Sequence, residues 1–298
     1  MNEVSLESIL RSVQPLSAMK SEYEKLIITV TVAPTWLYSN EIAPEVRKRW
    51  QMTPEEIADE VYRCYKAGAS IVHLHGEKAW PKDRWSKIIK LIRDKCDIII
   101  QMGLSSLSVE ERRPLMELKP EMMSVIISHH SEAFTDVSID MLHDWKEFTA
   151  QLKLCDEFDV KPELEIWHTG GIWNLVKLLE KNMLKLPPYL TLFFGWPGGT
   201  WTPPTFEEVL HRVRYLPPRC VWSTSSMPHP VPNCLNISVL TIMLGGHVRV
   251  GTEDYPYLSK NVLVKDNSEL VAKIARISRE LNREVATPNE ARKIIGIK

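Results

Sequence analysis

Short apolar runs of strand length alternate with segments of helical periodicity from residue 25 nearly to the end of the chain. The runs are almost continuously apolar, which is typical of parallel strands buried on both faces of a sheet. We therefore predict strands at residues 26–33, 69–75, 97–102, 121–128, 161–167, 189–195, 219–224 and 247–252.

Apolar residues recur at helical spacing between these runs. The clearest helix start is Thr53, because Pro54 suits the first helical position and Glu56 completes a capping box. Gly68 ends this helix. Further helices are predicted at 82–95, 108–118, 138–158, 170–182, 204–214, 233–244 and 267–281, and a short one begins at Thr287-Pro288.

Eight strands separated by helices predict an α/β fold of the TIM (β/α)₈ barrel type. The alternative is an open doubly wound sheet, which is less favoured because no glycine-rich phosphate turn follows the first strand. We expect a single barrel domain over residues 25–298, with an extra C-terminal helix. Residues 1–24 are expected to form a helical N-terminal arm.

Composition narrows the possible partners and the compartment. The 298 residues carry a formal net charge of −1, so neither nucleic acid nor a membrane surface is expected as a partner. The five cysteines are scattered without metal-clip spacing, which is typical of reduced thiols in the cytoplasm. The N-terminus does not resemble a signal peptide, and no apolar stretch approaches the roughly 18 residues that span a bilayer. We expect a cytoplasmic protein.

A possible metal site lies at the ends of two predicted strands. His73 and His75 close the second strand and point to the same face, because strand side chains alternate. Glu253 follows the eighth strand, and strands eight and two flank strand one in a closed barrel. Two histidines and a carboxylate suit a catalytic Zn²⁺ site, although Fe²⁺, Mn²⁺ and Co²⁺ also fit these ligands. The alternative is a hydrogen-bonded histidine pair, with Arg249 and Asp254 forming an ion pair at the rim.

Several segments resemble the β-keto acid cleavage enzymes. They are TPEEIADEVYRCYKAGASIVHLH, PELEIWHTG, FFGWPGG, GGHVRVGTED and the tail ELVAKIARISRELNREVATPNEARKIIG. The resemblance covers roughly residues 25–298, and the strand-eight motif together with the tail is its most specific part. It implies a zinc-dependent TIM barrel, usually oligomeric, that converts a β-keto acid and acetyl-CoA into acetoacetate and a new acyl-CoA.

The resemblance also implies roles for individual residues. His73, His75 and Glu253 correspond to the zinc ligands. Asp254, positioned by Arg249, corresponds to the group that removes a proton from the carbon between the two carbonyls. Zinc would polarise the ketone. A homotetramer or homodimer is the expected assembly, and the β-keto acid and the CoA thioester are the expected small-molecule partners.

The residues expected to bind substrate depart from the family's pattern. Tyr38 falls near a position where some members have a glutamate, and His168 replaces an acidic residue. His129 falls near a polar contact of the family. The full set of expected substrate-binding residues is Thr35, Tyr38, Ser105, His129, His168, Gly198 and Gly199, of which the two glycines can expose backbone N–H groups to a carboxylate or to part of CoA.

Tryptophans are numerous at predicted strand ends, namely Trp36, Trp167, Trp196, Trp201 and Trp222. They could hold a quaternary ammonium, line an apolar acyl pocket, or pack between helices and barrel. Three functions stay open at this point: a β-keto acid cleavage enzyme of altered substrate range, a metal-dependent hydrolase or lyase without CoA, and a non-catalytic member of the family.

Overall fold

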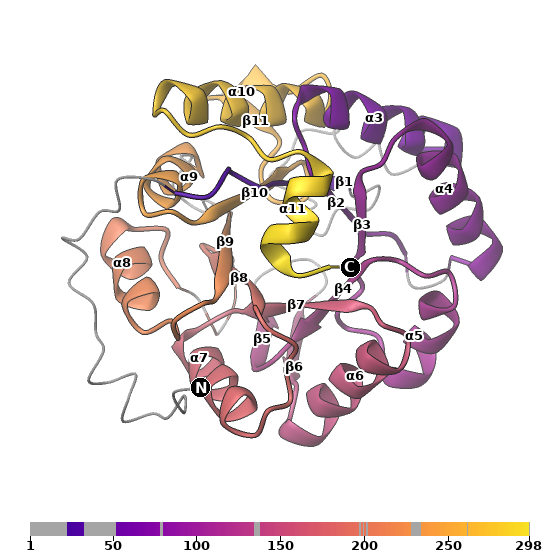
Figure 1. Ribbon diagram of the computed structural model, residues 1–298, viewed down its shortest axis with the longest axis vertical. Coiled ribbons are helices and arrows are strands. Elements are labelled where there is room, and N and C mark those ends of the chain that lie inside the picture. The colour runs from indigo at the N-terminus through magenta and orange to yellow at the C-terminus, as the bar shows by residue number, and fades with distance from the viewer. Residues whose placement is uncertain are drawn as a thin grey trace.

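Eight parallel strands close into a barrel in the order β1-β10-β9-β8-β7-β4-β3-β2, which confirms the predicted TIM barrel (Figure 1). The computed structural model describes residues 23–32, 52–77, 80–133, 138–196, 198, 200, 202–227, 234–260 and 262–297. The barrel strands are β1 (Ile28–Val32), β2 (Ile71–Leu74), β3 (Ile99–Met102), β4 (Met122–Ile126), β7 (Lys161–Ile166), β8 (Tyr189–Phe194), β9 (Val221–Ser226) and β10 (His247–Gly251).

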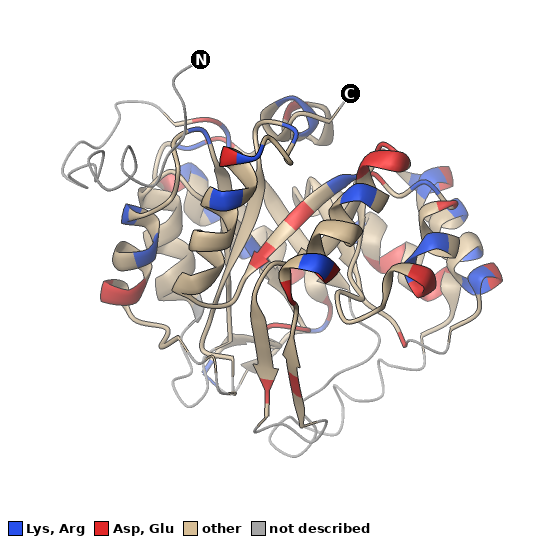
Figure 2. Cartoon of the chain, turned by 90° about the horizontal axis from the view of Figure 1, so that it is seen from below, with Lys and Arg blue, Asp and Glu red and all other residues tan. Residues whose placement is uncertain are grey.

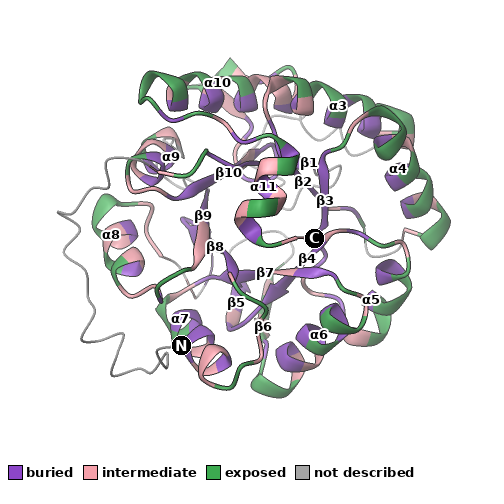
Figure 3. Ribbon diagram, viewed as in Figure 1, coloured by how far each residue is buried: buried purple, intermediate pink, exposed green. Residues whose placement is uncertain are grey.

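Helices form a ring outside the strands, and their buried faces are turned toward the barrel (Figure 3). They are α3 (Pro54–Ala67), α4 (Lys82–Lys95), α5 (Val109–Met116), α6 (Trp145–Glu157), α7 (Thr169–Glu180), α8 (Phe206–Arg214), α9 (Cys234–Met243) and α10 (Asn267–Glu280). The first of them begins and ends as predicted. Thr53 and Glu56 form both hydrogen bonds of a capping box, and Gly68 ends the helix in a left-handed conformation at φ 118°.

The helix predicted over 138–158 is wrong in its first part. The chain instead forms an antiparallel hairpin of β5 (His129–Glu132) and β6 (Ile139–Leu142), and α6 begins only at Trp145. Ser138 has a φ of 47°, which a right-handed helix does not permit. The side chain of Asp144 accepts a hydrogen bond from the Glu147 backbone N–H, so it fixes the helix start after the hairpin.

A second hairpin, of β11 (Tyr257–Ser259) and β12 (Val262–Leu263), stands between the last barrel strand and α10 and was not predicted. The first 22 residues of the predicted N-terminal arm lie outside the described residues. Within the described part of the chain, no helix is both long and apolar enough to cross a membrane.

The extra C-terminal helix, α11 (Pro288–Ile295), lies across one end of the barrel (Figure 1). Its Ala291 and Ile295 pack with residues that begin the barrel strands, among them Ile71 and Ile99. Figure 2 shows this helix at one end of the molecule and the β5–β6 hairpin at the other. The N-terminal end of the barrel is therefore filled by apolar packing, and polar strand-end residues gather at the C-terminal end.

A layer of polar side chains crosses the barrel interior between these two ends. We call it the polar belt and define it as Gln101, Ser124, Glu163, Thr191 and Ser223, all of which are buried. The carboxylate of Glu163 accepts hydrogen bonds from Gln101, from Ser124 at 2.6 Å and from Thr191, while Thr191 also contacts Ser223 at 2.9 Å. A single acidic side chain on β7 thus connects β3 and β4 on one side of its own strand with β8 on the other.

Burial raises the pKa of Glu163 to about 7, and the neighbouring Glu165 adds to this, although Arg249 opposes it. An ordinary carboxyl group would release its proton near pH 4.5 in the unfolded chain. The folded state binds this proton more tightly than the unfolded chain does. Protonation of Glu163 therefore stabilises the fold at acidic pH, and this stabilisation is lost as pH rises toward 7.

We predict that the Glu163→Gln substitution removes this contribution to the pH dependence of folding stability, because glutamine stays uncharged at every pH. Between pH 4.5 and 7, the free energy of unfolding of the wild type should fall relative to that of the variant by on the order of 3 kcal/mol. Urea denaturation at a series of pH values measures the difference, and other titrating groups cancel because both proteins share them. Parallel stability profiles for the two proteins would contradict the prediction.

Candidate functional site

The two strands that flank β1 bring the histidines and Glu253 to the same place. Thr31 of β1 pairs with His73 of β2 on one side and with Gly251 of β10 on the other. A Cβ atom at Gly251 would lie 2.0 Å from the Thr31 Oγ1, so only glycine allows this close approach. The chain then turns directly after β10, and Glu253 reaches back over β1 toward His73.

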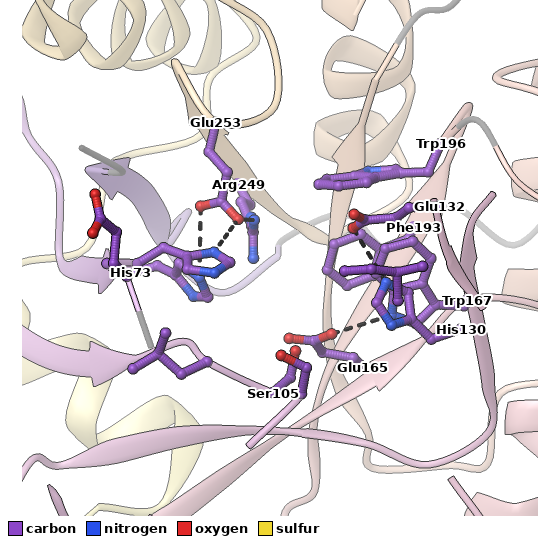
Figure 4. Close-up of a pocket in the computed structure, with 16 residues that line it drawn as sticks. His73, Ser105, His130, Glu132, Glu165, Trp167, Phe193, Trp196, Arg249 and Glu253 are labelled. Carbon is purple, nitrogen blue, oxygen red and sulfur yellow. Dashed lines mark hydrogen bonds and ion pairs between the residues drawn. The ribbon is translucent and has the colours of Figure 1, made fainter. Parts of the chain in front are cut away.

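His73, His75 and Glu253 form a compact group that could hold a metal ion, here called the ligand set, and Figure 4 shows how Glu253 and His73 face each other. His75 Nδ1 lies 3.0 Å from Glu253 Oε1, and His73 Nε2 lies 3.6 Å from Glu253 Oε2. One ligand atom from each residue lies within 4.8 Å of the other two. Among the described residues, Glu253 Oε2 is buried without a hydrogen-bond partner. A cation bound between these atoms would supply that partner.

The local charges favour ligand forms that bind metals. Burial lowers the pKa of His73 well below its usual value, and nearby Arg249 adds to this, so its imidazole is neutral at pH 7. Burial opposes ionisation of Glu253, but Arg249 and the two histidines outweigh it, and the pKa of this carboxyl is lowered. Burial also acts against protonation of His75, yet the Glu253 carboxylate prevails and raises its pKa. A bound cation would displace that proton.

Arg249 lies between two buried carboxylates. Its Nη2 is 3.0 Å from Glu253 Oε1 and also 3.0 Å from Asp254 Oδ1, while its Nε donates to Asp254 Oδ2 at 3.1 Å. Burial and the adjacent Glu253 raise the pKa of Asp254 to about 6, although Arg249 opposes this. Both oxygens of Asp254 are therefore held by one guanidinium group.

The neighbouring strand supports His73. Gln101 Nε2 lies 3.0 Å from His73 Nδ1, which connects the ligand set to the polar belt. Gly103 follows the same strand, and a Cβ atom there would lie only 2.6 Å from His73 Nε2. Any side chain at this position would require a shift of the His73 ring.

Two buried arginines hold the loops at this end of the barrel. The guanidinium of Arg112 donates to the carbonyls of Ser105 at 2.6 Å and Leu107 at 3.0 Å. Arg212 donates to the Phe193 carbonyl at 2.6 Å and to that of Ile166. Because these carbonyls lie at or just beyond strand ends, the arginines fix the residues that follow the strands.

A cavity of about 250 Å³ opens beside the ligand set. One wall carries His73, His75, Arg249 and Glu253. The opposite wall is formed by the rings of Trp167, Phe193 and Trp196 together with His130, Glu132 and Glu165 (Figure 4). The Trp167 and Phe193 rings are stacked with their centroids 4.6 Å apart, and Trp167 Nε1 donates a hydrogen bond to Glu165 Oε2 at 3.1 Å.

The expected substrate-binding residues are not all at this cavity. Ser105 lines it. His129 lies on the β5–β6 hairpin and pairs with Asp140, whereas its neighbour His130 faces the cavity. His168 caps α7 by accepting the Gly170 N–H at 3.0 Å.

Of the remaining expected residues, Gly198 packs against the Ser131 carbonyl, where a Cβ atom would lie 2.0 Å away. Thr35, Tyr38 and Gly199 lie outside the described residues, as do Trp36 and Trp201. Trp222 is not among the residues that line the cavity and instead lies against Gly246.

The sequence indicates His130 as a possible ligand or general base, whereas several other residues of the cavity were missed in the sequence, among them Glu132, Glu165 and Phe193. A signal existed for Glu165, because Glu163 and Glu165 alternate within an otherwise apolar strand and both must point into the barrel. The hairpin residues could not be assigned, since their segment was interpreted as a loop followed by a helix.

Comparison with known proteins identifies the family. The sequence profile of the beta-keto acid cleavage enzymes matches residues 27–297. A 3-keto-5-aminohexanoate cleavage enzyme of Fusobacterium nucleatum is 33% identical over 92% of this chain and 99% of that protein. A 3-oxoadipate:acetyl-CoA acetyltransferase of Cupriavidus necator is 27% identical over 83% of this chain and 87% of that protein.

The solved apo structure of ObcA superimposes with a TM-score of 0.68 at 16% identity, over 82% of this chain and 65% of that one, which supports the fold. Together with the sequence match over nearly the whole barrel, these findings show that the chain belongs to the beta-keto acid cleavage enzyme family.

Proposed function

We propose that the protein is a zinc-dependent β-keto acid cleavage enzyme with an altered substrate pocket. It would condense a β-keto acid with acetyl-CoA and release acetoacetate and a new acyl-CoA. The observation that carries this proposal is the ligand set of His73, His75 and Glu253 in a buried cavity of a chain from this family. We expect the enzyme to act in the cytoplasm as a homodimer or homotetramer.

The residues present fit a metal ion. Two imidazoles and one carboxylate are a common catalytic zinc set and leave coordination positions for substrate. The partnerless Glu253 Oε2 and the neutral His73 ring support this assignment. Gln101 Oε1 also has no hydrogen-bond partner among the described residues. Gln101 Nε2 contacts His73 Nδ1 at 3.0 Å and so fixes the orientation of the His73 ring, as an outer partner of a metal-bound histidine does.

When bound, zinc supplies a Lewis acid that polarises the ketone and stabilises developing negative charge. Asp254, held by Arg249, removes a proton from the carbon between the keto and carboxyl groups. That carbon bonds to the acetyl carbonyl, and the C–S bond breaks to release CoA thiolate. The thiolate then attacks the original ketone carbon, and the C–C bond breaks to give the new acyl-CoA. Asp254 returns its proton to the departing carbon, which yields acetoacetate.

The wall opposite the ligand set receives the acyl tail of the substrate. Three aromatic rings cover this wall, and the buried carboxylates of Glu132 and Glu165 lie among them. Aromatic faces and carboxylates both favour a positive charge and disfavour a second carboxylate. We therefore propose that the tail is neutral or cationic.

The metal site is tested by its removal. Purified protein should contain zinc close to one equivalent per chain, and the His73→Ala, His75→Ala double variant should retain less than about a tenth of it. A His129→Ala, His168→Ala double variant loses two histidines outside the cavity and should keep its zinc. Elemental analysis measures the metal, and circular dichroism confirms the fold. Full zinc in the first variant would place the site elsewhere.

The reaction is tested with acetyl-CoA labelled with ¹³C in its acetyl group and a panel of β-keto acids. Labelled acetoacetate and an unlabelled new acyl-CoA are expected, because the acetyl group moves to the carbon of the keto acid. Asp254→Asn should lower kcat by about 10²- to 10⁴-fold while the zinc content stays unchanged. If no member of a broad panel yields labelled acetoacetate, the proposal is wrong.

The charge preference of the tail is tested within the same panel. Substrates with a neutral or ammonium tail should exceed 3-oxoadipate, whose tail ends in a carboxylate, by at least about tenfold in kcat/KM. Glu165→Gln keeps an acceptor for Trp167 Nε1 but removes the charge, so it should narrow this ratio. An unchanged ratio in the variant, or a wild-type preference for 3-oxoadipate, would refute the assignment.

A further inference from the structure

A second cavity, of about 370 Å³, lies behind the ligand set, outside the barrel strands. Its walls come from β10, from Leu235 and Ser238 of α9, from Leu270, Lys273 and Ile274 of α10, and from the β11–β12 hairpin. The β9 residue Ser226 also lines it. The structure thus builds this cavity from the last two barrel strands and their helices, at the same end as the ligand set.

Arg249 is the residue that the two cavities share among their described lining residues. Glu253 lines the first cavity and Asp254 lines the second, although they are adjacent in sequence. The guanidinium of Arg249 contacts both carboxylates at 3.0 Å. The two cavities therefore adjoin at Arg249, and Asp254 belongs to the lining of the second.

The second cavity suits a long, partly apolar anion. Arg249, Lys260 and Lys273 provide three positive charges, whereas Asp254 is the one acidic residue among the described residues that line it. Asp254 is already paired with Arg249, so the two lysines remain to attract an anion. Leu235, Leu258, Leu270 and Ile274 form apolar surface, and the rings of Tyr255 and Tyr257 lie 5.4 Å apart at the hairpin.

We propose that the second cavity binds the CoA thioester, an inference that rests on the proposed function. The acyl-pantetheine arm would lie along the apolar walls with its thioester beside Arg249. The phosphates would contact Lys273 and the exposed Lys260. The whole of CoA is larger than the cavity, so its nucleotide extends past the β11–β12 hairpin, where a tyrosine ring can stack on adenine.

This placement agrees with what the reaction requires. The carbon–carbon bond joins an atom of the keto acid, held in the first cavity, to the thioester carbonyl, held in the second. The two atoms must meet beside Arg249, where the two cavities adjoin. Asp254, which Arg249 holds at this junction, is then beside the carbon that loses its proton and attacks the thioester.

The test compares binding of CoA to the zinc-loaded wild type with binding to a Lys260→Ala, Lys273→Ala double variant by calorimetry. Loss of two phosphate contacts should raise the Kd for CoA about tenfold and weaken its salt dependence. Pantetheine, which has no phosphate, should bind both proteins equally. A Lys87→Ala, Lys90→Ala variant on α4 loses the same charge and should match the wild type. KM for the keto acid should stay within about twofold in both variants.

Each result distinguishes the two proposals. Wild type that binds no CoA refutes the proposed function itself. If the wild type binds CoA and the Lys260→Ala, Lys273→Ala variant binds it as tightly, the proposed function is retained, but CoA does not bind in the second cavity. Lys260→Ala alone should raise the Kd about threefold. This single variant guards against an effect of Lys273 on the hairpin, because the Lys273 ammonium also donates to the Leu258 carbonyl.

Discussion

The mouth of the barrel depends on how the buried charge of Glu253 is balanced. One guanidinium, that of Arg249, lies between the carboxylates of Glu253 and Asp254, and burial keeps the nearby His73 neutral. The remaining positive charge comes from the proton on His75, whose pKa the Glu253 carboxylate raises, and a bound cation would take the place of this proton. An unbalanced buried ion costs several kcal/mol, so a divalent cation is the natural complement to this set of side chains.

The rest of the fold keeps these charges in position. The register of β10, β1 and β2 aligns His73 with Gly251 across Thr31, and only a residue without a side chain permits the turn toward Glu253. Inside the barrel, Gln101 connects His73 with Glu163 and so with the other strands of the polar belt. A change in the polar belt is expected to reach the ligand set through this amide, because packed interiors transmit displacements.

The sequence predicted the barrel and the proximity of His73, His75 and Glu253, because both depend on local periodicity and on which residues end a strand. That these residues bind a metal stays a prediction. His73, His75 and Glu253 needed only the alternation of strand faces and the closure of the barrel. The β5–β6 hairpin was missed because its polar residues run directly into the apolar spacing of α6. The signal that was available is Asp144, whose capping role separates the two elements.

Because the hairpin was not predicted, the residues expected to bind substrate in this segment were assigned wrongly. Along a strand, a difference of one position reverses the face, so His130 and Glu132 reach the cavity while His129 does not. His168 sits just before Thr169, where a side chain that accepts a backbone N–H begins a helix. The second cavity could not be predicted, since helices and a hairpin far from one another in sequence have to pack before it exists.

The contacts between β1 and the C-terminal part of the chain have a consequence for folding during protein synthesis. Ile27 donates its N–H to His247, 220 positions later, and Leu26 forms a bridge with Val285. The first strand therefore leaves the ribosome long before its partner β10 has been made. Until then, one edge of β1 is an unpaired and strongly apolar template that other chains can join. Nascent chains that stall before β10 has been made are the ones expected to need a chaperone.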